Sequence, residues 1–200
     1  MSSVLDVVSR GRTNVTPTIV ALVGNKNTQV AHANNVNIII QSAPANTKPD
    51  LNTEYYNLFV KGDESFSDGH FIITKDRALT EYMPPEAKAQ FSSLSIDAIS
   101  QIRSLPSLFA SENHGNGRTD DDHQAYFGIV TDIKPQDNGI KIYFRSFSAI
   151  PQQRLNEMAF ELSIQGSKSF NELNRTHWAI KRINLIEELK KAGVGVLVPV

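Results

Sequence analysis

Two histidines and four carboxylates gather within residues 112–123, the most polar stretch of the chain. Carboxylate oxygens and imidazole nitrogens are ligands for Mg²⁺, Mn²⁺ or Zn²⁺, and a metal bound there could polarise a phosphate or activate water. Under this interpretation the protein is a metal-dependent phosphodiesterase or nuclease. Its catalytic residues are then His114, Asp120, Asp122 and His123, and three of these, His114, Asp120 and His123, are the candidate metal ligands.

The same stretch has a second interpretation as a solvated loop, which we prefer. The consecutive aspartates at 120–122 cannot all converge on one ion, and residues 115–117 read Gly-Asn-Gly, which is typical of a mobile surface loop. No HExxH, HxD or DxD arrangement with a second supporting cluster accompanies it. We therefore predict no cofactor, and a divalent metal belongs only to the enzyme alternative.

A basic group surrounds the only tryptophan of the chain. If the ring of Trp178 points outward, it could stack on a base while basic neighbours contact phosphate, which would make the protein a reader of nucleic acid or of modified bases. If the ring points inward, it anchors the core and the basic residues form a solvated face, and this interpretation is preferred. The nucleic-acid-binding candidates are Arg175, His177, Trp178 and Lys181.

Composition excludes several classes of chemistry. The chain has no cysteine, so disulfides, thiolate nucleophiles and cysteine-bound zinc or iron–sulfur clusters are ruled out. Twenty basic and 21 acidic residues give a formal charge of -1, so no net positive field attracts nucleic acid, although a local basic patch remains open. The chain has no G-x-G-x-x-G, Walker lysine or G-x-S-x-G motif.

No segment approaches the roughly 20 apolar residues that span a bilayer, and residues 1–6 do not begin a signal peptide. We therefore expect no membrane partner and a cytoplasmic location.

Residues 1–45 differ from the rest of the chain because short β-branched runs alternate with asparagine and glycine. This pattern predicts a three-stranded β-meander, a segment that suits assembly with the rest of the chain or with another subunit. The prolines at 44 and 49 mark a linker, so we predict a boundary between residues 1–45 and a globular domain of residues 46–200. The stretch from Gly24 to Val30, followed by Val36 to Ile38, resembles Asn-rich stretches found beside effector domains in bacterial conflict and phage-defence proteins.

The 46–200 domain begins with two strand-like runs at residues 55–60 and 70–74, and Pro84 and Ser95 then begin two helices. The next element is a β-hairpin near residues 126–147, because two alternating runs flank Asp137-Asn138-Gly139, the strongest short turn signal.

A helix from Pro151, a strand at 177–183 and a final helix ending before Gly193 complete the domain. This order predicts an α+β fold with a largely antiparallel curved sheet or small barrel and appended helices. It is similar in plan to PUA-like domains, which implies binding of modified bases or other ligands.

The missing catalytic motifs and the Asn-rich meander favour a non-catalytic binding or adaptor protein. We expect a protein partner or homo-oligomer, with nucleic acid as an alternative partner. The resemblance of the meander implies an accessory subunit of a prokaryotic multi-protein system, with antiviral defence as one such setting.

Overall fold

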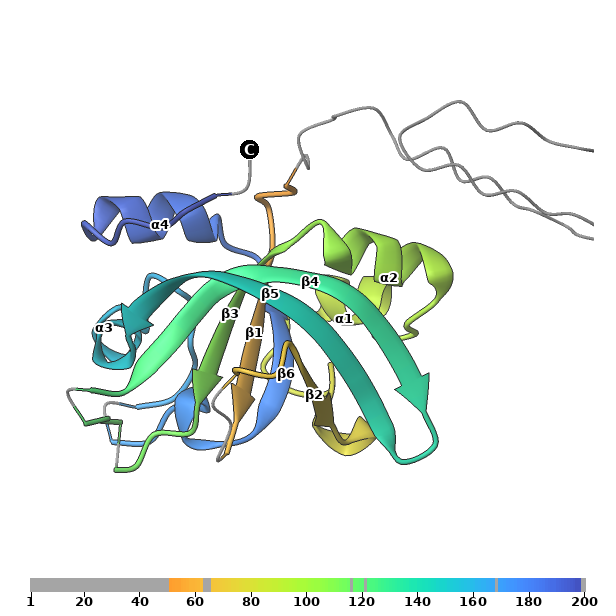
Figure 1. Cartoon of the computed structure of the whole chain (residues 1–200), viewed down its shortest axis with the longest axis horizontal. Helices are drawn as coiled ribbons and strands as arrows, with labels where there is room; N and C mark the ends of the chain where they lie inside the picture. The colour runs from red at the N-terminus through yellow and green to blue at the C-terminus, as the bar shows by residue number, and fades with distance from the viewer. Residues whose placement is uncertain (1–50, 63–65, 116, 121, 168, 199–200) are drawn as a thin grey trace, which may run out of the picture. The chain divides into compact units, whose positions relative to one another are not determined.

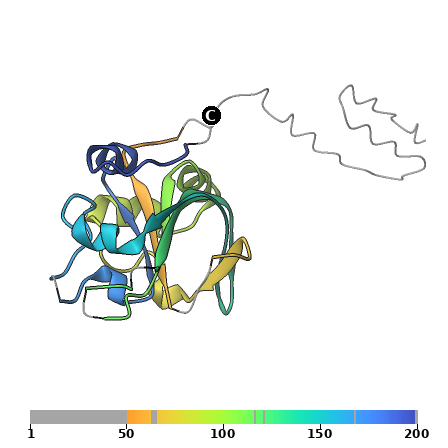
Figure 2. The ribbon, with the colours of Figure 1, turned by 60° about the vertical axis from the view of Figure 1, so that its left-hand side comes forward.

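The computed structural model describes residues 51–62, 66–115, 117–120, 122–167 and 169–198. Its centre is a six-stranded sheet in the order β2-β5-β4-β3-β1-β6. Figure 1 shows β4 and β5 as a long curved ribbon whose turn lies far from α3 and α4, and Figure 2 shows the same separation. The strands are β1 (Tyr56–Lys61), β2 (His70–Ile73), β3 (Pro106–Ser111), β4 (Gln124–Gln136), β5 (Gly139–Pro151) and β6 (His177–Lys181).

The helices lie between and after these strands. They are α1 (Pro85–Phe91), α2 (Ile96–Arg103), α3 (Gln152–Glu157) and α4 (Leu185–Lys191), with short 3₁₀ turns η1 (Lys75–Arg77) and η2 (Glu172–Asn174). The side chain of Ser95 accepts a hydrogen bond from the amide of Ala98 and so caps α2, as its sequence predicts. Asn184 caps α4 in the same way.

The sheet is mixed, because β1 pairs parallel with β3 and every other pairing of named strands is antiparallel. The α+β class is confirmed. The prediction of a small barrel, one of its two forms, is wrong, because β2 and β6 are the two edges of an open sheet. The predicted 1–45 meander lies outside the described residues. No helix in the described part of the chain is long and apolar enough to cross a membrane.

The predicted hairpin is confirmed. Gln136 pairs with Gly139, which leaves Asp137 and Asn138 as a two-residue turn. Gly139 has a φ of 153°, and a Cβ there would lie 2.8 Å from a side-chain carbon of Ile72. A larger residue would therefore collide with the neighbouring strand.

Two hydrophobic cores cover opposite faces of the sheet. In β1, Leu58 faces one core and Phe59 the other, as the period of two requires. One core includes Phe91 and Ile102 of α1 and α2, and the other includes Leu155 of α3 together with apolar side chains of α4.

Two β-bulges switch the hairpin between these cores. The register shifts between Phe127 and Gly128 and again between Val130 and Asp132. Phe127 and Ile133 are an even number of residues apart on β4, yet Phe127 lies in the core beneath α3 and α4 and Ile133 in the core beneath α1 and α2. The curvature of the hairpin follows from these bulges, since each adds one unpaired residue and increases the local twist.

Candidate functional site

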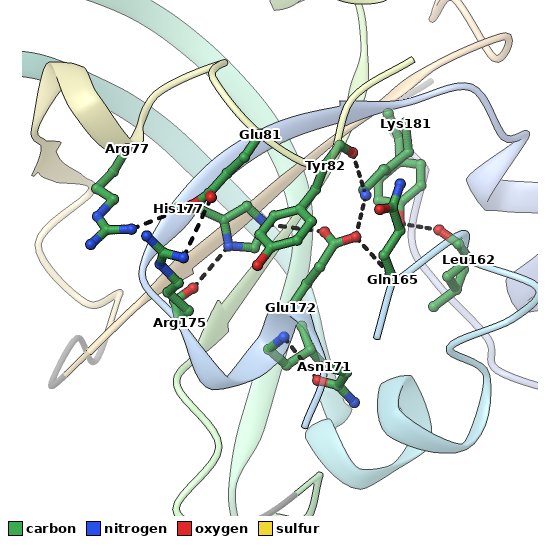
Figure 3. Close-up of polar contacts among 12 residues, drawn as sticks. Arg77, Glu81, Tyr82, Leu162, Gln165, Asn171, Glu172, Arg175, His177 and Lys181 are labelled. Carbon is green, nitrogen blue, oxygen red and sulfur yellow. Dashed lines mark hydrogen bonds and ion pairs between the residues drawn. The ribbon is translucent and has the colours of Figure 1, made fainter. Parts of the chain in front are cut away.

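A buried group of charged side chains lies between β6, η2 and the loop between η1 and α1, which contains Tyr82. Figure 3 shows Glu172 at its centre, with His177 on one side and Lys181 on the other. The ammonium Nζ of Lys181 lies 2.5 Å from Glu172 Oε1, and the other carboxylate oxygen lies 3.1 Å from His177 Nε2. None of the three side chains is more than 1% exposed. We call Glu172, His177 and Lys181, together with the backbone groups of Tyr82 and Gln165 that contact them, the Glu172 cluster.

The two hydrogen bonds of His177 constrain its proton count. Its Nδ1 lies 2.8 Å from the carbonyl oxygen of Arg175, which can only accept, so Nδ1 carries a proton. Its Nε2 faces Glu172, and a hydrogen bond there needs a further proton. Either His177 is an imidazolium beside a carboxylate, or Glu172 itself carries that proton.

The interior position of the Glu172 cluster changes the acidity of its members. Burial lowers the pKa of Lys181, and the contact with Glu172 opposes this effect. Burial also raises the pKa of Tyr82, and the nearby carboxylates of Glu81 and Glu172 raise it further. The carbonyl oxygen of Tyr82 accepts from Lys181 Nζ at 2.6 Å, so this ammonium contacts two oxygens. The buried charges are thus paired, as burial requires.

A second polar group connects α3, η2 and the residue that follows Glu112. The Asn113 side chain donates to Asn156 Oδ1 at 3.0 Å and accepts from Gln152 at 3.2 Å. Asn171 also donates to Asn156 at 2.9 Å, and its own Oδ1 accepts from the amide of Leu173. We call the set Asn113, Gln152, Asn156, Asn171 and Asn174 the asparagine cluster. Its hydrogen bonds join η2 to α3, beside the apolar core that Leu173 and Leu155 share.

These two clusters support the chain between them, residues 158–171, which we call the aromatic segment. The amide of Gln165 donates to Glu172 Oε1 at 2.6 Å, and the Tyr56 hydroxyl donates to the carbonyl of Leu162 at 2.6 Å. Leu162 and Ile164 are buried beneath the segment. Its backbone is therefore held at one point by Tyr56 of β1 and at another by Glu172 of η2.

The aromatic segment holds two phenylalanine rings in solvent. Phe160 is 92% exposed and Phe170 is 57% exposed. Gly166 helps to place the second ring, because its φ is +119° and a Cβ there would lie 2.5 Å from the carbonyl oxygen of Phe170. Both rings are therefore accessible to a partner.

The Trp178 ring points inward, which is the preferred of the two orientations considered from the sequence. It is fully buried, its ring stacks on Phe59 at 5.1 Å, and its Nε1 donates to Asn57 Oδ1 at 3.2 Å. His177 and Lys181 are buried beside Glu172. Arg175 alone among the four candidates reaches the surface, where it pairs with Glu81 at 3.4 Å. Trp178 therefore offers no ring face on which a base could stack.

The structure brings together three of the candidates in the 112–123 stretch. His114 Nδ1 lies 2.8 Å from Asp120 Oδ2, and the His114 and His123 rings lie 4.6 Å apart, edge to face. Asp122 is exposed. The His123 Nε2 atom is buried and has no hydrogen-bond partner among the described residues.

Within the described residues, no group of three histidine or carboxylate side chains is arranged to hold a metal ion. Asp121, also in this stretch, lies outside the described residues. What the geometry does provide is an imidazole oriented by a carboxylate, the arrangement of a general base.

Protein-family models, curated proteins and solved structures were each compared with the chain, and none matches. The site must therefore be judged on its own geometry.

Sequence reasoning missed the exposed phenylalanines and Glu172. The apolar stripe of the predicted helix runs through Leu155, Met158 and Leu162, and Phe160 falls off that stripe. An aromatic residue off the core-facing stripe is a usable signal of exposure. No sequence signal marked Glu172 as a buried charge, because its pairing with His177 and Lys181 depends on a turn followed by a strand.

Proposed function

We propose that this protein is a non-catalytic binding or adaptor module that contacts a partner protein through its aromatic segment. The observation that carries the proposal is the exposure of Phe160 and Phe170, at 92% and 57%. Aromatic side chains are enriched at the energetic centres of protein interfaces, where they fill pockets of the partner.

The charge of the segment supports a protein partner. The segment contains two charged residues in its sequence, Glu161 and Lys168, whose formal charges cancel. Depletion of charge around aromatic residues is the compositional mark of an interface centre, whereas a nucleic-acid surface needs cations.

The anchoring of the segment supports binding without a large conformational change. Hydrogen bonds from Tyr56 and to Glu172 hold the backbone beneath the rings. Ser167 also closes a tight turn by donating its amide to the Phe170 carbonyl at 2.8 Å. A surface already ordered before binding loses less conformational entropy when the partner docks.

The biological setting remains the one proposed from the sequence. An accessory subunit of a prokaryotic multi-protein system, including one in antiviral defence, would use such a surface to join another subunit. Support for this setting is the resemblance of residues 24–38 to stretches in conflict and defence proteins.

The proposal is tested by affinity capture and light scattering with the full chain. Phe160→Ser combined with Phe170→Ser should abolish capture of a specific protein, or self-association if the partner is a second copy. Ile96→Ser is the matched control, because Ile96 is 88% exposed on α2. Equal binding by the double variant and the wild type would contradict the proposal, as would equal loss in the control.

A second candidate function is phosphodiester hydrolysis in the 112–123 stretch. It is favoured by the 2.8 Å contact between His114 and Asp120, which orients His114 as the candidate general base, and by the adjacent ring of His123. Nuclease activity should be measured with Mg²⁺ and Mn²⁺ on the wild type and on His114→Ala and His123→Ala. Metal-dependent cleavage lost in both variants would establish an enzyme, and its absence in the wild type would eliminate this candidate.

A further inference from the structure

A basic and aromatic patch covers the end of the sheet formed by β2, β5 and the distal part of β4. It consists of His70, Lys134, Lys141, Tyr143 and Arg145, which we call the Tyr143 face. Lys141 and Tyr143 alternate along β5 with Ile142 and Phe144 of the core beneath α1 and α2, so they point away from that core.

The rings and cations of the Tyr143 face lie close together. The ammonium groups of Lys134 and Lys141 lie 5.0 and 5.2 Å from the centroid of the Tyr143 ring. The His70 ring lies 5.8 Å from the same ring, and His70 pairs with Tyr143 across the strands. Arg145 is exposed on the same strand.

The placement of the two lysines is unfavourable for the free protein. Lys134 and Lys141 are directly opposite each other across the hairpin, and like charges at paired positions destabilise a sheet. Asp132 is 3.7 Å from Lys134 and compensates only part of this charge. Lys134 and Lys141 therefore leave an excess of positive charge around the Tyr143 ring. Arg145, whose guanidinium lies 5.6 Å from the centroid of the Phe147 ring, adds a third cation on the same strand.

This combination matches the chemistry of single-stranded nucleic acid. A cationic surface attracts the phosphates, and an aromatic ring stacks on an unpaired base whatever its sequence. Alternate residues of a strand lie about 7 Å apart, which suits the phosphate spacing of an extended single strand. Lysine also has a flexible stem, so each ammonium can move from the ring to a phosphate.

We propose that the Tyr143 face binds single-stranded nucleic acid, with Tyr143 as the stacking residue and Lys134, Lys141 and Arg145 as phosphate contacts. This surface is separate from the aromatic segment and does not depend on the proposed protein partner. It also differs from the Trp178 group, in which the ring is buried.

The test is fluorescence anisotropy of labelled 20-nucleotide oligo(dT), oligo(U) and a DNA duplex with the full chain at low salt. The wild type should bind the single strands more tightly than the duplex, and the two single strands distinguish a DNA from an RNA preference. Tyr143→Ala should weaken binding about 5- to 150-fold, whereas Tyr143→Phe, which keeps the ring, should bind like the wild type.

The lysines are tested through the salt dependence of binding. In the double variant Lys134→Ala with Lys141→Ala, the slope of log K against log salt should become shallower by about 1.4, because two phosphate contacts are lost. Lys190→Ala is the control, since Lys190 is an exposed lysine of α4. Circular dichroism at rising temperature shows that each variant is folded.

Three outcomes would overturn the proposal. The first is no binding of either single strand by the wild type, and the second is equal affinity of folded Tyr143→Ala and Tyr143→Phe. The third is a loss in Lys190→Ala as large as that in the lysine double variant, which would indicate attraction without a defined surface.

Discussion

The hydroxyl of Tyr56 donates a 2.6 Å hydrogen bond to the carbonyl oxygen of Leu162, which lies 106 residues further along the chain. This bond joins a central strand of the sheet to the base of the aromatic segment. Tyr56 is fully buried, and burial raises its pKa well above the ordinary 10.0, with the charge of Glu172 as a further cause. A surface feature is thus attached to a fully buried side chain of β1.

Stability should fall at alkaline pH because of Tyr56. The folded protein keeps the phenolic proton at pH values where the unfolded chain releases it, so this contribution is complete below pH 10.0 and is lost as pH rises above it. The unfolding free energy of the wild type minus that of Tyr56→Phe should therefore decrease by about 1.4 kcal/mol per pH unit above that value. Urea unfolding of both proteins from pH 8 to 11 measures this difference, and a constant difference would contradict the assignment.

Removing one member of the buried ion pair should be more harmful than removing both. Glu172→Leu leaves Lys181 as a buried cation without its carboxylate, and the loss of stability should be about 3–5 kcal/mol. Adding Lys181→Met removes that unpaired charge, so the double variant should be more stable than Glu172→Leu alone. Urea unfolding at pH 7 measures the wild type, Glu172→Leu, Lys181→Met and the double variant. If the double variant instead lost the sum of the two single effects, the pair would not be coupled.

Most local elements could be predicted from the sequence, because their signals are local. Ser95 caps α2, Asn184 caps α4, and Asp137 and Asn138 form the hairpin turn, each through contacts within a few residues. β3 was missed, because no strand was predicted between the helix that begins at Ser95 and the hairpin, the region that contains Pro106. Proline is tolerated at the first residue of a strand, and there it begins the strand that pairs parallel with β1.

The candidate site was less predictable, because long-range contacts decide it. Alternation along the hairpin suggested one common apolar face, but the bulges place Phe127 and Ile133 in different cores. The Trp178 ring could be outward or inward from its sequence alone, and only its position against Phe59 decides between them. Chemistry-bearing residue types were recognised in the sequence, whereas their exposure required the fold.

The asparagine cluster should control the order of the aromatic segment without touching its rings. Asn113→Ala removes hydrogen bonds to Asn156 and from Gln152, and should cost about 1–3 kcal/mol and increase amide exchange in residues 166–174. Hydrogen exchange by mass spectrometry measures this increase.

A matched control for Asn113 is Asn184→Ala, which removes the cap of α4. It should cost about 1 kcal/mol and leave exchange in residues 166–174 unchanged. Equal exchange in that region for Asn113→Ala and the wild type would show that the cluster does not order the segment.

Gly128 should tolerate no side chain at the first bulge. A Cβ at this position would lie 2.1 Å from the carbonyl oxygen of Arg145 and 2.9 Å from Ser146 Cα, so backbone atoms would have to move. Gly128→Ala should lose about 1–3 kcal/mol, the usual range for overpacking, in a thermal or urea unfolding experiment. Gly195→Ala is the comparison, because nothing lies within 4 Å of a Cβ there. Equal stability of the two variants would contradict the bulge geometry.

The most direct test of the proposed function is photocrosslinking in cells of the organism whose genome encodes the protein. The full chain is expressed with p-benzoylphenylalanine in place of Phe160, and separately in place of Ile96 on α2, which is almost as exposed. If the aromatic segment is the contact surface, irradiation should join position 160 to one defined protein, identified by mass spectrometry, and position 96 should give no such product. No adduct at position 160, or the same set of adducts at both positions, would contradict a binding surface at Phe160 and Phe170.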